Sequence, residues 1–426
     1  MKRYITLGIL LILITSCEFG EKGKVIEPAD YNAYLETGPS KTSSKYFRLW
    51  NSKIKPDSLQ LTSFGIVAGQ YNSYFQATGE IEYLKKAESA LEKAVDIAAI
   101  GQSGYLRALA RNYISQHRFK EALLLALQAR KLGSGVLETQ YLLFDLYMEL
   151  GEFNKAERYL DSTRNMSAFG HLIRLAKWND HKGKLDVTIR LMEKATAKAE
   201  QAANRNTMLW SYTNLADYYG HAGRIDDSYR HYLKALSLDP KNAYAKKGIA
   251  WIAYSYEGNT AEAMRILDSI SEHYHSPDLY LLKAEIAEYM GDSIEYMKSM
   301  NAFFKMSENP SYGDMYNAYI IDTYLNGTLQ YDKALALALR DANNRPTPSA
   351  YGLLAYSYFK AGEKEQAYQV VQEHVMGKTQ EPLVLLQIAE ILKDRGDLAR
   401  TSEIKNSLKE AAYELGPVTA MRVEAL

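Results

Sequence analysis

Residues 215–240 read LADYYGHAGRIDDSYRHYLKALSLDP, and this stretch decides the fold. Leu215 and Tyr219 are four residues apart, which places them on one face of a helix. Gly223 suits the left-handed position that ends such a helix, and Pro240 follows a second run of the same periodicity. The stretch therefore predicts two short helices joined by a tight turn.

The same pattern returns about every 34 residues between residues 58 and 415. A residue near the start of each predicted second helix, usually a small one, marks the copies, and a glycine precedes most of these markers by five residues. A repeat of this length predicts helical hairpins that stack into one quasi-linear domain. The ten markers are Ala87, Ala122, Ala156, Thr188, Ser228, Ala263, Tyr296, Ala334, Ala367 and Thr401.

The repeat resembles the tetratricopeptide-repeat family, and the resemblance covers about 85% of the mature chain. It rests on the marker residues, on the glycine before them and on a tyrosine near the end of the first helix, as in Tyr113, Tyr147 and Tyr358. The resemblance implies an all-α fold, a right-handed superhelical solenoid of about ten units. In that family the first helices line a concave groove.

The family's groove-facing positions imply a set of candidate binding residues on the first helices. Charges of both signs with interspersed aromatic rings suit an extended peptide. The alternative is that each residue is a solvated position on an amphipathic helix. Trp210 is the expected anchor, unless it packs on the extra residues 200–206. The candidates are Arg107, Arg111, Tyr141, Asp145, Lys177, Asp180, His181, Trp210, Asp217 and His221.

Signatures of catalysis and of metal binding are weak in this chain. His181 and His221 hold the same repeat position, but no HExxH motif or short histidine spacing supports a zinc site. The sequence lacks a GxSxG elbow, a phosphate-binding loop and a GxGxxG fingerprint. Basic and acidic residues number 51 each, so no excess of positive charge favours nucleic acid. We expect a binding protein with no enzymatic activity, no metal and no cofactor.

The first 17 residues carry a targeting pattern. The chain begins MKR, continues with an apolar run at residues 5–14 and then reads Thr15-Ser16-Cys17. A basic start and about ten apolar residues indicate a secretory signal, too short to span a bilayer. Its end resembles the bacterial lipobox, in which the cysteine is lipidated and becomes the new N-terminus; Cys17 is the only cysteine. The alternative is a plain signal peptide with an incidental cysteine.

The chain is thus divided into a signal peptide at residues 1–16 and a lipidated N-terminus with a flexible tether at residues 17–45. A possible N-terminal cap follows at residues 46–57, and the apolar residues 31–35 are also candidates to dock on the first repeat. The solenoid occupies residues 58–415, and residues 416–426 form a C-terminal tail.

These features predict a bacterial envelope lipoprotein, in the outer membrane, with a periplasmic or surface-exposed orientation left open. Its groove is expected to bind a protein or peptide partner, as an adaptor or assembly factor. The alternative function is capture of a ligand or glycan at the surface by groove aromatics. The lipid is the expected contact with the membrane, and no nucleic-acid partner is expected.

Overall fold

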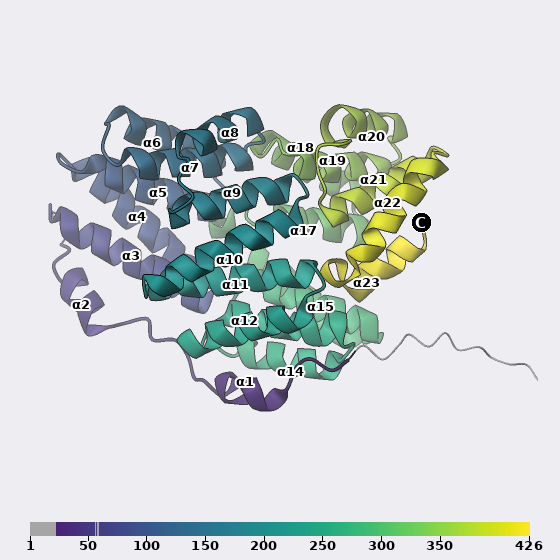
Figure 1. Cartoon of the computed structure of the whole chain (residues 1–426), viewed down its shortest axis with the longest axis horizontal. Coiled ribbons are helices and arrows are strands. Elements are labelled where there is room, and N and C mark those ends of the chain that lie inside the picture. Colours follow the sequence, from purple (N-terminus) through teal and green to yellow (C-terminus); the bar gives the residue numbers. More distant parts are fainter. Residues whose placement is uncertain (1–22, 56, 58) are drawn as a thin grey trace, which may run out of the picture.

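The computed structural model describes residues 23–426 except residues 56 and 58, and its regular structure is entirely helical within those residues (Figure 1). The predicted signal peptide and Cys17 lie outside the described residues. In the part of the chain that is described, no helix has both the length and the apolar character needed to cross a membrane.

Ten helical hairpins follow one another along the described chain, preceded by α1 and α2 and followed by α23. A short π-helical segment continues α13, α17 and α20. The α-helices are α1 Pro28–Leu35, α2 Lys45–Asn51, α3 Leu61–Thr78, α4 Ile81–Ile97, α5 Gln102–Ser115, α6 Phe119–Lys131, α7 Val136–Glu149, α8 Phe153–Ser162, α9 Phe169–His181, α10 Leu185–Gln201, α11 Arg205–His221, α12 Ile225–Leu238, α13 Ala243–Trp251, α14 Thr260–Ser271, α15 Pro277–Met290, α16 Ser293–Ser307, α17 Asn317–Asp322, α18 Tyr331–Asn344, α19 Pro348–Lys360, α20 Lys364–Val370, α21 Pro382–Asp394, α22 Leu398–Glu410 and α23 Ala412–Glu424.

The marker residues lie where the two helices of each hairpin touch. Nine of the ten are at most 3% exposed, and only Tyr296 is half-buried. A small side chain at this point lets the helices approach closely, so the hydrophobic faces of neighbouring hairpins merge into core clusters that extend over several hairpins. The turns also match expectation, because Gly151 has a φ of 68° and His117, which replaces glycine, has a φ of 57°.

The solenoid coils far enough for its two halves to meet. We call α3–α12 the N-terminal half and α13–α22 the C-terminal half. The hairpin turns of the N-terminal half lie against the loops that connect hairpins in the C-terminal half: the Thr78 carbonyl accepts a hydrogen bond of 2.6 Å from the His275 N–H. Asn344 Nδ2 likewise donates to the His117 carbonyl at 3.1 Å.

Residues 24–39, here called the N-terminal strap, pack on the outside of the solenoid. The prediction of a flexible tether over residues 17–45 is therefore wrong for this part. Ile26 and Tyr31 are each 1% exposed, and they are buried in the core around α12 and α14. The Tyr31 hydroxyl donates to Glu262 at 2.5 Å. Residues 31–35 thus dock on the middle of the solenoid, not on the first repeat, whereas α2 does pack on α3.

The predicted C-terminal tail, residues 416–426, is also part of the fold. It belongs to α23, which contacts α11, α15, α21 and α22 (Figure 1). Gly416 has a φ of 75° and sits among the side chains of Trp251 and Glu285, which leaves no space for a larger residue. This tail carries no repeat signature, but its Val423 and the adjacent Leu415 belong to a core cluster with Leu386 and Leu408.

Candidate binding surface on the inner face of the solenoid

The inner face consists of the ten candidate residues on α5, α7, α9 and α11 together with the side chains they contact. At its N-terminal end, Arg174 of α9 joins the candidates of α5 and α7. Arg174 Nη2 lies 2.5 Å from Asp145, and its guanidinium covers the Tyr141 ring at 4.3 Å. Burial lowers the pKa of Arg111, and the nearby positive charge of Arg174 lowers it further. Arg111 nevertheless contacts solvent.

Arg107 and Tyr141 have partly structural roles in this region. Arg107 Nη1 donates to the Ser134 carbonyl at 2.8 Å and to the Thr139 hydroxyl at 3.2 Å, which ties α5 to the start of α7. A Cβ on Gly170 would lie 2.6 Å from the Tyr141 ring, so the missing side chain makes room for that ring.

Lys177 shares the carboxylate of Glu149 with Arg345, which comes from the other half of the chain. Its ammonium is 2.8 Å from Glu149, and Arg345 reaches the second oxygen of Glu149 at 2.9 Å. Burial alone would raise the pKa of Glu149, but Lys177 and Arg345 hold it below its usual value. Lys177 therefore helps to join the two halves and is not a free cation.

The two histidines have different surroundings. His181 stacks on Phe153 with ring centroids 4.0 Å apart, whereas His221 Nδ1 lies 3.7 Å from Glu414 of α23. Desolvation raises the pKa of Asp180, and it lowers that of His221. No group of three or more potential metal ligands occurs among the residues that the structure describes.

Asp217 is engaged by two tyrosine hydroxyls. Tyr232 donates to one carboxylate oxygen at 2.5 Å and Tyr244 donates to the other at 2.6 Å. Burial raises the pKa of Asp217, and the two hydroxyls oppose that change. Asp217 therefore stabilises the contact between α11, α12 and α13, which makes it a structural residue more than an open binding group.

Trp210 remains accessible. Its side chain is 42% exposed, and its ring meets the edge of Phe169 with centroids 6.1 Å apart. The extra residues 200–206 lie at the end of α10 and the start of α11, where Glu200 accepts a hydrogen bond from Tyr212. Trp210 thus rests on α9 of the preceding hairpin and presents part of its indole to solvent.

Further along the chain the inner face is closed by α23. The Tyr413 carbonyl accepts hydrogen bonds from Trp251 Nε1 at 3.1 Å and from the Ser255 hydroxyl at 2.7 Å. A Cβ on Gly220 would lie 2.6 Å from the Tyr413 ring. The C-terminal helix therefore occupies the place where a ligand would contact α11 and the end of α13.

Sequence reasoning identified residues that share the inner face but missed their partners. Arg174, Arg345, Tyr413 and Glu414 complete the network, and the last three come from segments about 200 residues away along the chain. No sequence pattern within a single repeat predicts such pairs. The accessible candidates are Arg111, Asp180 and Trp210, whereas most of the others are engaged in contacts within the chain.

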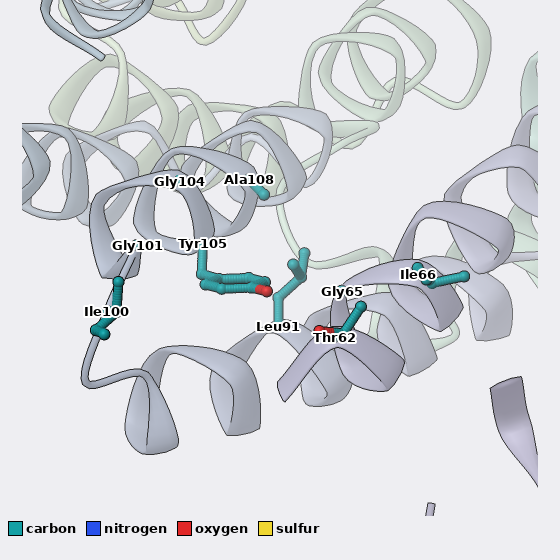
Figure 2. A pocket seen from close by; sticks show the side chains of 9 residues that line it. All are labelled: Thr62, Gly65, Ile66, Leu91, Ile100, Gly101, Gly104, Tyr105 and Ala108. Atoms are coloured by element: carbon teal, nitrogen blue, oxygen red, sulfur yellow. The ribbon is translucent and has the colours of Figure 1, made fainter. Parts of the chain in front are cut away.

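An apolar pocket of about 470 Å³ lies between α3 and α5 (Figure 2). The Tyr105 ring reaches across it toward Gly65, where a Cβ would lie 2.8 Å from Tyr105 Cε1. Nothing in its lining is charged. The pocket is lined by Thr62, Gly65, Ile66, Leu91, Ile100, Gly101, Gly104, Tyr105 and Ala108.

Comparison with known proteins gives a family match within the fifth hairpin. The family described as tetratricopeptide repeat matches residues 211–242, which include α12 and most of α11. No curated protein matches the chain.

Two solved structures are similar in part. A tetratricopeptide repeat protein from Parabacteroides merdae is 18% identical with a TM-score of 0.39, over 59% of this chain and 95% of that one. Human IFIT1, a dimer with PPP-AAAA, is 15% identical with a TM-score of 0.47, over 73% of this chain and 71% of that one. These likenesses are too distant to carry functional information.

The matched unit includes the stretch that predicted the fold, and the described chain repeats its hairpin ten times. Repeats of this kind form scaffolds for protein–protein interaction. The described chain is an all-α solenoid of helical hairpins, and the hairpin at residues 211–242 matches the tetratricopeptide-repeat family.

Proposed function

We propose that this protein is a lipid-anchored adaptor of a bacterial cell envelope that binds a protein partner through the N-terminal part of its inner face. The observation that carries the binding proposal is the exposure of Trp210 and Arg111, while α23 fills the inner face further along the chain. An exposed aromatic ring and an exposed cationic group on one face provide apolar area and orientation for an extended peptide.

The anchor proposal is supported by the sequence around Cys17. A short apolar run ends in a lipobox-like Ile14-Thr15-Ser16-Cys17, and the rest of the chain has no other cysteine. Several acyl chains on one residue attach a protein durably to a bilayer. We expect labelled palmitate to enter the wild-type protein but not Cys17→Ala. Persistent incorporation in the variant would remove the support for a lipid at this residue.

The binding proposal is tested by capture from detergent-solubilised envelope. We expect a stoichiometric protein partner with the wild type. The double variant Arg111→Ala with Trp210→Ala should weaken that binding by more than ~2 kcal/mol, about 30-fold in Kd. Leu124→Ala is the matched control, because Leu124 is 62% exposed on α6, a second helix that lies outside the inner face.

Two outcomes contradict the adaptor reading. Wild-type affinity in the double variant places the binding surface elsewhere on the solenoid. Absence of any protein partner, together with binding to a glycan array that Trp210→Ala abolishes, favours the alternative of ligand capture.

A further inference from the structure

The two long edges of the coil differ in what covers them. A Cβ on Gly79 or Gly151, in the hairpin turns of the N-terminal half, would lie 2.6 Å and 2.2 Å from carbonyl oxygens of the C-terminal half. A Cβ on Gly291 or Gly396, in the hairpin turns of the C-terminal half, would meet no described atom within 4 Å. The second set of turns, here called the outer edge, is therefore not covered by the other half of the solenoid, although the N-terminal strap meets it beside Glu257.

The outer edge carries large apolar side chains at its tips. Ile294 is 83% exposed, Leu398 is 65% exposed and Leu329 is 58% exposed, and each lies at a different hairpin turn. In the N-terminal half the corresponding residue Phe119, which begins α6, is only 2% exposed, and Arg345 of the other half covers its ring. Isolated exposed apolar residues are ordinary, but three of the five hairpin tips along this edge carry one, and they form a row interrupted at the Gly362 turn.

The described chain also begins at this edge. The N–H groups of Val25 and Ile26 both donate to Glu257, at 2.6 Å and 2.7 Å, and Glu257 directly precedes the hairpin turn at Gly258. Seven residues lie between Cys17 and Val25, and the eight Cα-to-Cα steps of a fully extended chain reach about 29 Å at most. A lipid on Cys17 therefore holds the Gly258 turn of the outer edge within about 30 Å of the bilayer.

The opposite edge is held further away. Ile100 lies in a connecting loop of the N-terminal half and is 87% exposed. Two helices of 14 residues, such as α5 and α15, separate the two edges when their ends meet, which is on the order of 40 Å. Ile100 is thus an apolar residue of matched exposure on the edge that the anchor does not bring to the membrane.

We propose that the outer edge docks on the phospholipid surface, with Ile294, Leu329 and Leu398 inserted at the level of the headgroups. This inference rests on the proposed lipid anchor. Single apolar side chains at hairpin tips, separated by polar turns, suit shallow insertion into a bilayer interface, where each buries its own surface independently. A protein partner requires a continuous patch with a well-packed centre, which this row of separate tips does not provide.

The test measures the depth of a label in vesicles. Ile294→Cys and Leu398→Cys, and the control Ile100→Cys, are placed in the full chain and labelled with an environment-sensitive fluorophore. The lipidated proteins are reconstituted in vesicles of phosphatidylcholine and phosphatidylglycerol at 3:1. Nitroxide-labelled lipids should quench the label at residues 294 and 398 several-fold more than at residue 100. Equal quenching at residues 100 and 294 overturns the proposal.

A second measurement shows whether insertion causes the docking. With the label at Leu329→Cys, the additional changes Ile294→Glu and Leu398→Glu should lower quenching at least threefold, because carboxylates oppose insertion; unchanged quenching overturns the proposal. All three side chains are exposed, so folding is preserved. The mass of the peptide containing residue 17 reports the anchor separately. If it carries no lipid, the anchor fails, and quenching of the unlipidated chain mixed with the same vesicles still decides whether the edge binds lipid.

Discussion

Glu285 offers a direct test of how crowded the interior of the coil is. Its carboxylate accepts a hydrogen bond of 3.2 Å from Tyr254, and burial, with the nearby Glu288 and Asp322, raises its pKa from 4.5 to about 7. Between those two values the folded protein retains a proton that the unfolded chain releases. The free energy of unfolding therefore falls as the pH rises from about 4.5 to about 7, and the loss is complete above pH 7.

The size of this loss follows from the change in pKa. A change from 4.5 to about 7 corresponds to about 3 kcal/mol at most. Glu285 retains some contact with solvent, so we expect about 2 kcal/mol. Glutamine has the same shape, keeps an acceptor for Tyr254 and cannot ionise. Glu285→Gln should therefore stabilise the protein by about 2 kcal/mol at pH 8 and by almost nothing at pH 4.5.

Urea unfolding followed by circular dichroism at pH 4.5 and pH 8 measures both values. Glu157→Gln is the control, because Glu157 is exposed on α8 and its loss of charge should change stability little at either pH. Equal effects of Glu285→Gln at the two pH values would refute the reasoning, since they would show that Glu285 ionises in the folded protein as it does in the unfolded chain.

Two further changes probe the contacts that the solenoid makes with itself. Tyr31→Ala should weaken docking of the N-terminal strap by about 3–5 kcal/mol, because Tyr31 is 1% exposed. Hydrogen exchange should show loss of protection at residues 25–35, with α14 unchanged. Retained protection at residues 25–35 would contradict a docked strap. Gly151→Ala and Gly223→Ala both place a side chain at a φ near 70°, but only the side chain at residue 151 meets Pro346. Gly151→Ala should therefore lower the free energy of unfolding by at least ~1 kcal/mol more than Gly223→Ala does. Equal losses in the two variants would count against the contact between the halves.

The local sequence pattern was sufficient to predict the hairpins, but it was not sufficient to predict how they coil. The spacing of Ala122, Ala156 and the other markers follows from contacts between adjacent helices, so one sequence period contains the information. The approach of Arg345 to Glu149 depends on small rotations added over several hairpins, and no single repeat encodes their sum. The all-α solenoid was therefore predictable. The pairing of Lys177 with Glu149, and that of Asp217 with two tyrosines, was not.

The two ends of the chain were misjudged for a related reason. Residues 24–39 have a polar composition, and only a few apolar side chains, notably Ile26 and Tyr31, anchor them to the solenoid. The average composition of the segment does not register such isolated anchoring residues, so it predicts a flexible tether. Residues 416–426 lack the repeat signature because α23 has no hairpin partner, so its role in closing the inner face appears only in three dimensions.

The contact between the two halves has a consequence for biosynthesis. Asn344 and His117 are 227 residues apart, and Arg345 and Glu149 are 196 residues apart. At about 5–20 residues per second, a ribosome needs on the order of 10–40 s to make the chain that separates them. Each early hairpin can form on its neighbour during that interval, but its turn stays uncovered until the second half has emerged. A chaperone therefore has most to protect while only the N-terminal half has been made, and the finished coil forms only after nearly the whole polypeptide has been synthesised.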